Sequence, residues 1–180
     1  VRDYSQLTAL AQACTEQFGG IDVIVNNAGV ASGGFFAELS LEDWDWQIAV
    51  NLMGVVKGCK AFLPLLERSK GRIINIASML SFQGGIRVPS YTASKSGIAG
   101  ITRLLANEWA GKGVNINAIA PGYMATDNTA ALRADADRNK AILDRIPAGR
   151  WGTPEDLAGA AVFLASSASD YINGAVLPVD

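Results

Sequence analysis

The chain has 180 residues, of which 49% are hydrophobic and 18% are charged, a balance that supports one core of ordinary domain size. Its formal net charge of −2 leaves no electrostatic footprint for nucleic acid or an anionic membrane. It contains no histidine and two cysteines, Cys14 and Cys59. A Ser-His-Asp triad, an HExxH zinc site and a four-cysteine zinc site are therefore impossible. Acid–base chemistry falls to Tyr, Lys, Asp and Glu, and no metal site is expected.

Two features of the sequence predict a cytoplasmic protein. No apolar run approaches the ~20 residues that span a bilayer, and no signal peptide opens the chain. The two cysteines do not have the pattern of a disulfide framework, which fits a reducing compartment. We therefore expect neither a membrane nor a nucleic-acid partner.

The first half of the chain predicts a helix, a strand and a second helix. Apolar residues recur at helical spacing over residues 7–18, before two glycines that end the helix. Residues 21–25 are almost continuously apolar, which predicts a strand buried on both faces of a parallel sheet. Ser40 has the position of an N-cap, and its helix should reach about Leu66, with a kink near Pro64.

The next segment predicts two further buried strands, at residues 72–77 and 114–120, with a helix between them. Pro89 prevents this helix from starting earlier, and Ser90 is expected to cap it. The helix should end at about Lys112.

The last segment of the chain predicts a lid, a helix and a strand. Residues 130–146 are charged and amphipathic, as in a helical lid. The Thr-Pro pair at 153–154 is typical of a helix start, and that helix should reach about Ser166. Residues 175–179 predict a last strand. No linker, repeat or low-complexity segment divides the sequence, so we expect a single domain over residues 1–180.

Tyr91 and Lys95 lie four positions apart and would share one face of their helix. Tyrosine is a poor acid or base near neutral pH because its usual pKa is ~10. A nearby cation favours the phenolate and so lowers this pKa. The pair could move a proton to or from a hydroxyl or carbonyl oxygen, but two unrelated neighbours on an amphipathic helix would show the same spacing.

Polar or glycine-containing motifs end three of the predicted strands, where open α/β sheets place their chemistry. These motifs are Asn-Asn-Ala-Gly at 26–29, Ser78 and Pro121-Gly122. Together with Asn51 and the Tyr-x-x-x-Lys motif at 91–95, they resemble the short-chain dehydrogenase/reductase family over nearly the whole chain. The resemblance implies an α/β, Rossmann-like fold of three layers, in which a parallel sheet carries helices on both faces.

The resemblance also implies a catalytic set of four residues. Tyr91 would be the general acid/base, and Lys95 would lower its pKa while holding the nicotinamide ribose. Ser78 would hydrogen-bond the substrate oxygen, and Asn51 would hold a water that continues a proton relay from Lys95. The implied reaction transfers a hydride between a nicotinamide cofactor and a secondary alcohol or ketone.

The implied cofactor is NAD, with NADP not excluded, and its site is carried over from the family in the same way. The residues that would line the adenosine side are Asn26, Ala28 and Gly29. The residues that would hold the nicotinamide and its carboxamide are Pro121, Gly122, Met124 and Thr126, in addition to Tyr91 and Lys95. Taken singly, each of these motifs would be read as a turn after a strand.

The substrate is implied by a closer resemblance within the family. Residues 74–91 and 144–152 resemble the 2-dehydro-3-deoxy-D-gluconate 5-dehydrogenases, also described as 2-deoxy-gluconate 3-dehydrogenases, whereas earlier segments resemble general family members. A recombinant gene would explain this difference. The implied substrate is a small molecule, a keto-deoxy sugar acid. It would be bound by Ser78, Gln83, Arg87 and Tyr91. Arg87 can grip a carboxylate bidentately, although a solvated surface arginine is an equal alternative.

The sequence departs from the family at both ends. The family opens with a strand, a glycine-rich turn and a helix that takes the pyrophosphate, and this sequence shows no such turn. We therefore expect a fold that is truncated in its N-terminal half and at its C-terminus, and that is inactive by itself. The complete protein is expected to form a homo-oligomer, either a dimer or a tetramer. There are two alternatives. One is a non-catalytic nucleotide sensor or scaffold, which the intact catalytic set disfavours. The other is a sugar-nucleotide epimerase or dehydratase, which the absence of a substrate domain disfavours.

Overall fold

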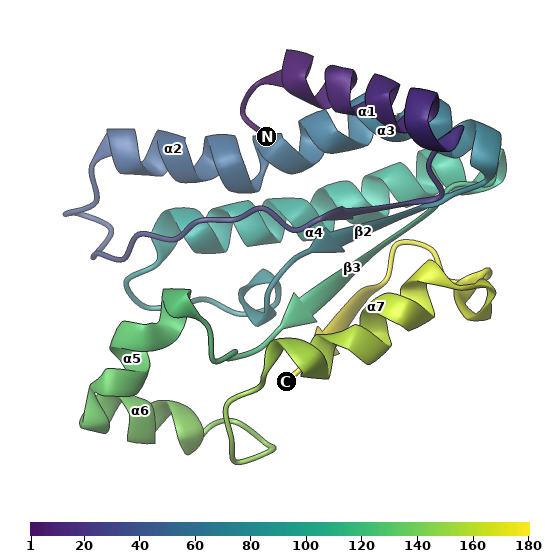
Figure 1. Cartoon of the computed structure of the whole chain (residues 1–180). Coiled ribbons are helices and arrows are strands. Elements are labelled where there is room, and N and C mark those ends of the chain that lie inside the picture. Colours follow the sequence, from purple (N-terminus) through teal and green to yellow (C-terminus); the bar gives the residue numbers. More distant parts are fainter.

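The computed structural model describes residues 1–180 and shows a parallel sheet with helices on both faces (Figure 1). The strands are β1 (Val23–Asn26), β2 (Arg72–Ile76), β3 (Asn115–Pro121) and β4 (Val176–Val179). They lie in the order β1-β2-β3-β4, and each pairs in parallel with the next. The predicted α/β class is confirmed, and all four strands end at the same edge of the sheet.

The helices connect these strands and agree in place with the sequence predictions. They are α1 (Tyr4–Phe18), α2 (Leu41–Asn51), α3 (Met53–Ser69), α4 (Pro89–Trp109), α5 (Ala130–Ala134), α6 (Ala136–Leu143) and α7 (Ala158–Ala165). The short 3-10 turns are η1 (Met79–Ser81), η2 (Ala110–Lys112), η3 (Asp127–Thr129), η4 (Pro154–Leu157) and η5 (Ser167–Ser169). The predicted lid is thus two short helices, α5 and α6, which lie together below the strand ends in Figure 1.

One face of the sheet is fully covered, by α1, α3 and α4. Ile24, Ile73 and Ile116 are register partners on β1, β2 and β3, so they form one row across this face. They are buried in the same cluster as Leu66 of α3 and Ile98 of α4. Each fully buried side chain of this kind contributes roughly 1.5–3 kcal/mol, so this row fixes the helical layer on the sheet.

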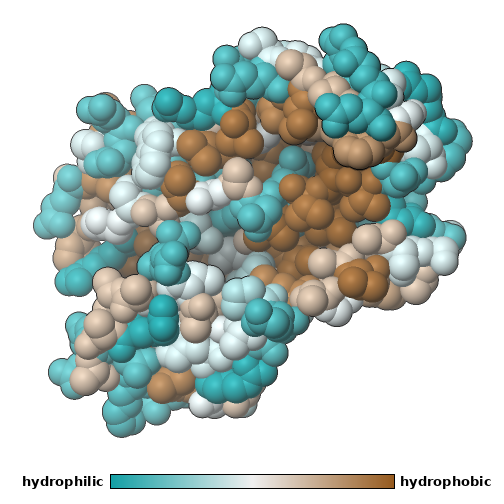
Figure 2. Space-filling view, viewed as in Figure 1, coloured by the Kyte–Doolittle hydropathy of each residue, from teal (hydrophilic) through white to brown (hydrophobic).

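The opposite face is covered by α7 over β2 and β3 only. Ile74 and Ile119 are buried there with Leu164 of α7, but Val25 of β1 is 51% exposed. Figure 2 shows apolar side chains gathered in a hollow over the sheet between α1 and α7. The expectation that the strand at 21–25 is buried on both faces is therefore wrong, because α7 packs on β2 and β3 and leaves β1 uncovered on this face.

The helix expected from Ser40 to about Leu66 is divided into α2 and α3. Ser40 caps α2 as predicted, since its Oγ accepts a 3.0 Å hydrogen bond from the Asp43 amide. The interruption lies at Leu52, between the two helices, whereas Pro64 lies inside α3. The interruption of the helix therefore lies at Leu52, whereas α3 continues through Pro64, and the kink expected near Pro64 stays a prediction.

The stretch Leu41–Ser69, which joins α2 and α3, is long and apolar enough to cross a membrane by length and composition alone. The expectation that no apolar run approaches the length of a membrane span is therefore wrong by this criterion. One such helix is weak support for a membrane protein, because core helices of soluble proteins have the same composition. Here Val55, Cys59 and Phe62 of α3 are buried in the main core cluster.

The start of α4 differs from the prediction that Ser90 caps it. The helix begins at Pro89, so the N-cap is Val88, which makes no side-chain capping bond. Proline at this first position fits because its missing N–H would have no helical partner. Ser90 lies within the first turn instead, fully buried.

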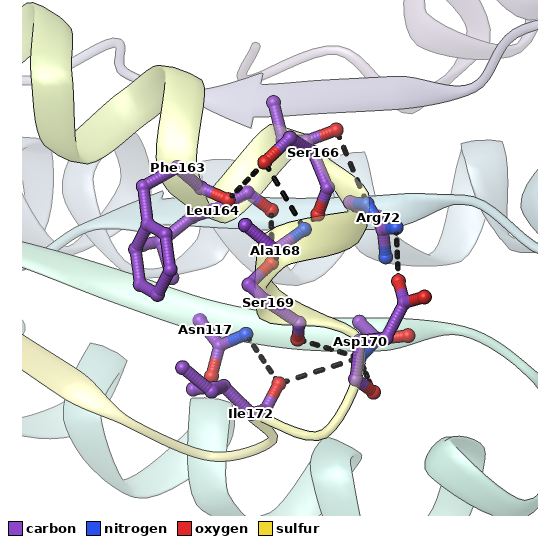
Figure 3. Close-up of polar contacts among 11 residues, drawn as sticks. Arg72, Asn117, Phe163, Leu164, Ser166, Ala168, Ser169, Asp170 and Ile172 are labelled. Carbon is purple, nitrogen blue, oxygen red and sulfur yellow. Dashed lines mark hydrogen bonds and ion pairs between the residues drawn. The ribbon is translucent and has the colours of Figure 1, made fainter.

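A polar network holds the segment after α7 against the sheet (Figure 3). Arg72, at the start of β2, donates to the Ala165 carbonyl at 3.1 Å and pairs with Asp170 at 2.6 Å. Asn117 of β3 donates to the Ile172 carbonyl at 2.8 Å. These contacts lie away from the carboxyl ends of the strands, so they stabilise the fold at the end opposite the predicted chemistry.

Candidate active site

The carboxyl ends of β1 and β2 bring two of the predicted catalytic residues, Asn51 and Lys95, together beside the predicted cofactor residue Gly29. Gly29 follows β1, and a Cβ atom added to it would lie 3.5 Å from Asn51 Oδ1 and 3.8 Å from Lys95 Nζ. Lys95 in turn donates a 2.7 Å hydrogen bond to the carbonyl of Ile76, the last residue of β2. The ammonium group is thus held between the ends of two neighbouring strands.

Tyr91 and Lys95 lie on the same face of α4, as their spacing predicts. The Lys95 Nζ atom is 5.5 Å from the centre of the Tyr91 ring. Lys95 is 4% exposed, and the structure shows no carboxylate paired with it. Burial of an ammonium without a counter-charge is costly and calls for a functional reason.

Burial shifts the pKa values of this pair in opposite directions. It lowers the pKa of Lys95 to about 8, because the buried ammonium loses its hydration. It raises the pKa of Tyr91, and a side-chain hydrogen bond with Ser78 opposes this shift only in part. The net pKa of Tyr91 is therefore raised, because desolvation of the phenolate outweighs the hydrogen bond with Ser78. The expected lowering of this pKa by Lys95 stays a prediction.

Ser78 lies two residues beyond the end of β2 and begins η1. Its Oγ accepts a hydrogen bond from the Leu80 amide at 3.2 Å, and its own amide donates to Ser81 Oγ at 3.3 Å. Ser81 Oγ donates to the Lys95 carbonyl at 2.7 Å. The turn that carries Ser78 is therefore tied to α4, which holds the Ser78 side chain beside the Tyr91 phenol.

Asn51 ends α2 and is fully buried, so its position within a helix is explained by contacts and not by exposure. Its Oδ1 accepts from the Val30 amide, and its Nδ2 donates to the Val30 carbonyl, both at 2.8 Å. Nδ2 also lies 3.3 Å from Ser94 Oγ on α4. The side chain fixes the segment after β1 to the helix with the Tyr-Lys pair, and its water-holding role stays a prediction.

The predicted adenosine side divides into two parts. Ala28 and Gly29 are exposed, as a cofactor-binding surface requires. Asn26 points into the protein, because its Nδ2 donates to Asn75 Oδ1 at 2.9 Å and lies 3.4 Å from Cys59 Sγ. The geometry supports a positioning role for Asn26, so its predicted contact with the cofactor has no support from this arrangement.

Asn75 is a residue that the sequence analysis did not single out. It is fully buried on β2 and joins Asn26 of β1 to Thr102 of α4, to which its Nδ2 donates at 3.0 Å. The signal was present, since Asn75 is the only polar side chain between Ile73 and Ala77. A buried polar group must be hydrogen-bonded, so such a residue marks a specific contact.

The predicted nicotinamide side lies at the carboxyl end of β3. Pro121 ends the strand, and the Gly122 amide donates to the Val179 carbonyl of β4 at 2.9 Å. Met124 is nearly buried, and Thr126 begins η3. No hydrogen bond joins these residues to Tyr91 or Lys95, so their part in cofactor binding stays a prediction.

The predicted substrate residues beyond Ser78 and Tyr91 lie in the exposed loop before α4. Gln83 makes no side-chain hydrogen bond. The Arg87 guanidinium carbon lies 4.5 Å from the centre of the Phe35 ring. Phe35 comes from the loop after β1, and nothing in its local sequence predicts this long-range contact.

The fold and this site define a dinucleotide-dependent type of α/β oxidoreductase, with a Ser-Tyr-Lys set at the strand ends. The family model described as enoyl-(acyl carrier protein) reductase matches residues 1–180. The chain belongs to the short-chain dehydrogenase/reductase family, and it is an NAD(P)-dependent oxidoreductase.

Individual relatives agree with this assignment. A 2-dehydro-3-deoxy-D-gluconate 5-dehydrogenase of Dickeya dadantii is 58% identical over 99% of this chain and 71% of its own length. The protein of that name from Escherichia coli is 56% identical over 100% of this chain and 72% of its own. A solved gluconate 5-dehydrogenase from Burkholderia cenocepacia, in complex with NADP and tartrate, is 36% identical, covers 99% of this chain and 71% of that one, and has a TM-score of 0.96. The predicted use of a nicotinamide cofactor is therefore confirmed.

Proposed function

We propose that this active site interconverts a secondary alcohol and a ketone of a keto-deoxy sugar acid. The observation that carries the proposal is the Tyr91–Lys95 pair on one face of α4, with the Lys95 Nζ atom 5.5 Å from the centre of the Tyr91 ring and Ser78 lowering the pKa of the phenol. The names of the 58% and 56% identical relatives support the class of substrate.

The catalytic roles follow from the chemistry of each side chain. In the oxidation direction, Tyr91 takes the hydroxyl proton while the hydride leaves the substrate carbon. In reduction, Tyr91 returns the proton to the oxygen, and Ser78 donates a hydrogen bond to that oxygen as its charge develops. Lys95 stabilises the phenolate whenever Tyr91 has lost its proton.

The residues at the strand ends fit a nicotinamide cofactor. Lys95 uses one of its three N–H donors on Ile76, which leaves two for ribose hydroxyls. Gly29 and Ala28 present backbone without a bulky side chain beside this ammonium. The bound nicotinamide would accept or supply the hydride. We propose NAD as the cofactor. Because a relative was crystallised with NADP, the assay below uses both cofactors.

Arg87 supplies a group that selects acids. A guanidinium binds a carboxylate through two parallel hydrogen bonds, and Arg87 is exposed four residues before Tyr91. The Burkholderia relative was crystallised in complex with NADP and with tartrate, which is itself a carboxylic acid. The carboxylate of the sugar acid is distant from the reacting carbon, so Arg87 would act on binding and not on the hydride step.

Residues 1–180 match 71% of the length of the Dickeya protein. The test therefore uses a longer protein that has the full length of that relative. A chimaera would join the unmatched residues of that relative to this chain. It would be assayed with keto-deoxy sugar acids, the matching neutral sugars and an acyl thioester, with NAD and with NADP, by following reduced nicotinamide. We expect the highest kcat/KM on the sugar acid. Preferred turnover of the thioester or of a neutral sugar would refute the substrate proposal.

We further propose that the complete enzyme is a cytoplasmic homo-oligomer, a dimer or tetramer. Gly97 packs on Leu52 of its own chain, whereas a side chain at Gly100 would meet no atom within 4 Å. Leu104, one turn further along α4, is 54% exposed. A glycine beside an exposed leucine permits close approach of a second helix. Light scattering of the chimaera tests this, and a monomer at micromolar concentration would contradict it.

A further inference from the structure

The loop after β1, residues 27–36 (the β1 loop), is fixed to its surroundings at alternate residues. Asn51 binds both backbone groups of Val30. Gln47 of α2, which is fully buried, donates from Nε2 to Ser32 Oγ at 2.6 Å. The buried side-chain amides of Gln47 and Asn51, one helical turn apart on α2, thus hold this loop in one position beside the active site.

The same loop is joined to Arg87 by two different contacts. The Gly34 amide donates to the Arg87 carbonyl at 2.9 Å, and the Phe35 ring lies 4.5 Å from the Arg87 guanidinium carbon. Arg87 also has a φ of 63°, a left-handed conformation that is uncommon outside glycine. Lys70 is the other non-glycine residue with a positive φ, and it ends α3, where this conformation is usual. Arg87 has no helix end to explain its conformation.

The contact with Phe35 leaves the hydrogen-bonding capacity of Arg87 free. None of the ion pairs of the chain includes Arg87, and its side chain makes no hydrogen bond. A cation–π contact with an aromatic ring occupies none of the guanidinium N–H donors with a hydrogen-bond acceptor. The side chain is therefore held in place while its donor edge stays open for an anion.

We infer that Phe35 is a positioning residue for substrate binding, which holds the Arg87 guanidinium ready for the carboxylate of the acid. This inference rests on the proposed function, because it assumes a carboxylate substrate. An unsupported arginine loses much side-chain freedom when it binds a ligand. A ring that already restricts the guanidinium reduces that loss, so Phe35 contributes to the affinity for acids without touching the reacting atoms.

The decisive experiment compares Phe35→Leu with Phe36→Leu in the chimaera. Both variants remove an exposed ring from the same loop, but Phe36 packs edge-on against Trp44 and does not meet Arg87. We expect Phe35→Leu to raise KM for the sugar acid roughly three- to tenfold. The values of kcat and of KM for the neutral sugar should not change. Phe35→Tyr keeps an aromatic face and should restore the parent KM.

Variants of Arg87 separate its side chain from its backbone. Arg87→Gly removes the guanidinium but accepts the positive φ, so the loop keeps its shape. We expect it to raise KM for the acid at least as much as Phe35→Leu does. Adding Phe35→Leu to Arg87→Gly should have no further effect, because the ring acts only through the guanidinium.

The two proposals fail in distinguishable ways. A parent enzyme that does not prefer the acid over the neutral sugar refutes the proposed substrate, and the role of Phe35 falls with it. A parent that prefers the acid, combined with equal effects of Phe35→Leu and Phe36→Leu or with additive effects of Phe35→Leu and Arg87→Gly, refutes the role of Phe35 alone.

Discussion

Lys95 holds its Nζ atom 5.5 Å from the centre of the Tyr91 ring, and the same atom donates to the carbonyl that ends β2. The ammonium thus joins the sheet to the proposed acid/base. Because both side chains are largely buried, the charge state of one depends on the charge state of the other, and pH is a direct probe of the site.

Replacing Tyr91 with Phe should abolish turnover in the chimaera and spare cofactor binding. The phenol is the titratable group whose pKa Ser78 lowers, and loss of a positioned acid/base costs typically ~10²–10⁴-fold in rate. Steady-state rates and a fluorescence titration with reduced cofactor would measure the two effects. Tyr171→Phe, at a fully exposed position, is the matched control. A Tyr91→Phe enzyme within a few-fold of the parent would remove Tyr91 from the mechanism.

Replacing Ser78 with Ala should change both the rate and the pH profile. The hydrogen bond with Ser78 lowers the pKa of Tyr91, so its removal should move the acidic limb of the oxidation rate, where Tyr91 must lose its proton, to higher pH. Loss of a donor at the reacting oxygen should also lower kcat by roughly 10²–10³-fold. The pH dependence of kcat/KM tests this, with Ser96→Ala on the exposed side of α4 as control. An unshifted limb would show that Ser78 does not interact with the phenol.

Lys95 should make stability depend on pH in a defined window. Its pKa in the folded protein is about 8, below the usual 10.5, so the unfolded chain binds more protons between these values. Stability therefore rises with pH in this window, and the cost of the buried charge is fully present below pH 8. The free energy of unfolding of the parent, measured relative to that of Lys95→Met, should increase by up to about 2 kcal/mol from pH 8 to about 9.5.

Urea unfolding of the cofactor-free chimaera at each pH would measure this gain. The window stops short of the range in which the raised pKa of Tyr91 has the opposite effect on stability. The exposed Lys60, replaced by Met, should give a difference that does not vary with pH. A flat difference for Lys95→Met as well would mean that the folded site does not favour neutral Lys95.

Residues 1–180 produced by themselves should be poorly soluble or misassembled, and should bind NAD weakly or not at all. β1 pairs on one side only, and its Val25 is 51% exposed, so the edge can pair with other chains. Val25→Lys should raise the soluble fraction, whereas Leu41→Lys, at an exposed helix position, should not. Soluble protein with micromolar NAD affinity and measurable turnover would contradict this prediction.

The sequence by itself determined the order and kind of the elements and the family. The apolar-rich runs at 72–77 and 114–120 are short and rich in β-branched residues, which favours buried strands, and residues 7–18 repeat with the period of a helix. The spacing of Tyr91 and Lys95 sets their common face because helix geometry is local. These features depend on neighbours in the chain, which is why they could be predicted.

The tertiary structure alone decided which polar groups meet and how they are charged. Asn26 points into the protein and donates a hydrogen bond to Asn75. Phe35 contacts Arg87, which is far from it in the sequence, and no local sequence pattern predicts this contact. The pKa of Tyr91 is raised by burial of the phenol, and that burial depends on elements far apart in the sequence. Hydration and long-range contact are properties of the packed molecule, so they became visible only when the sheet and α4 were in place.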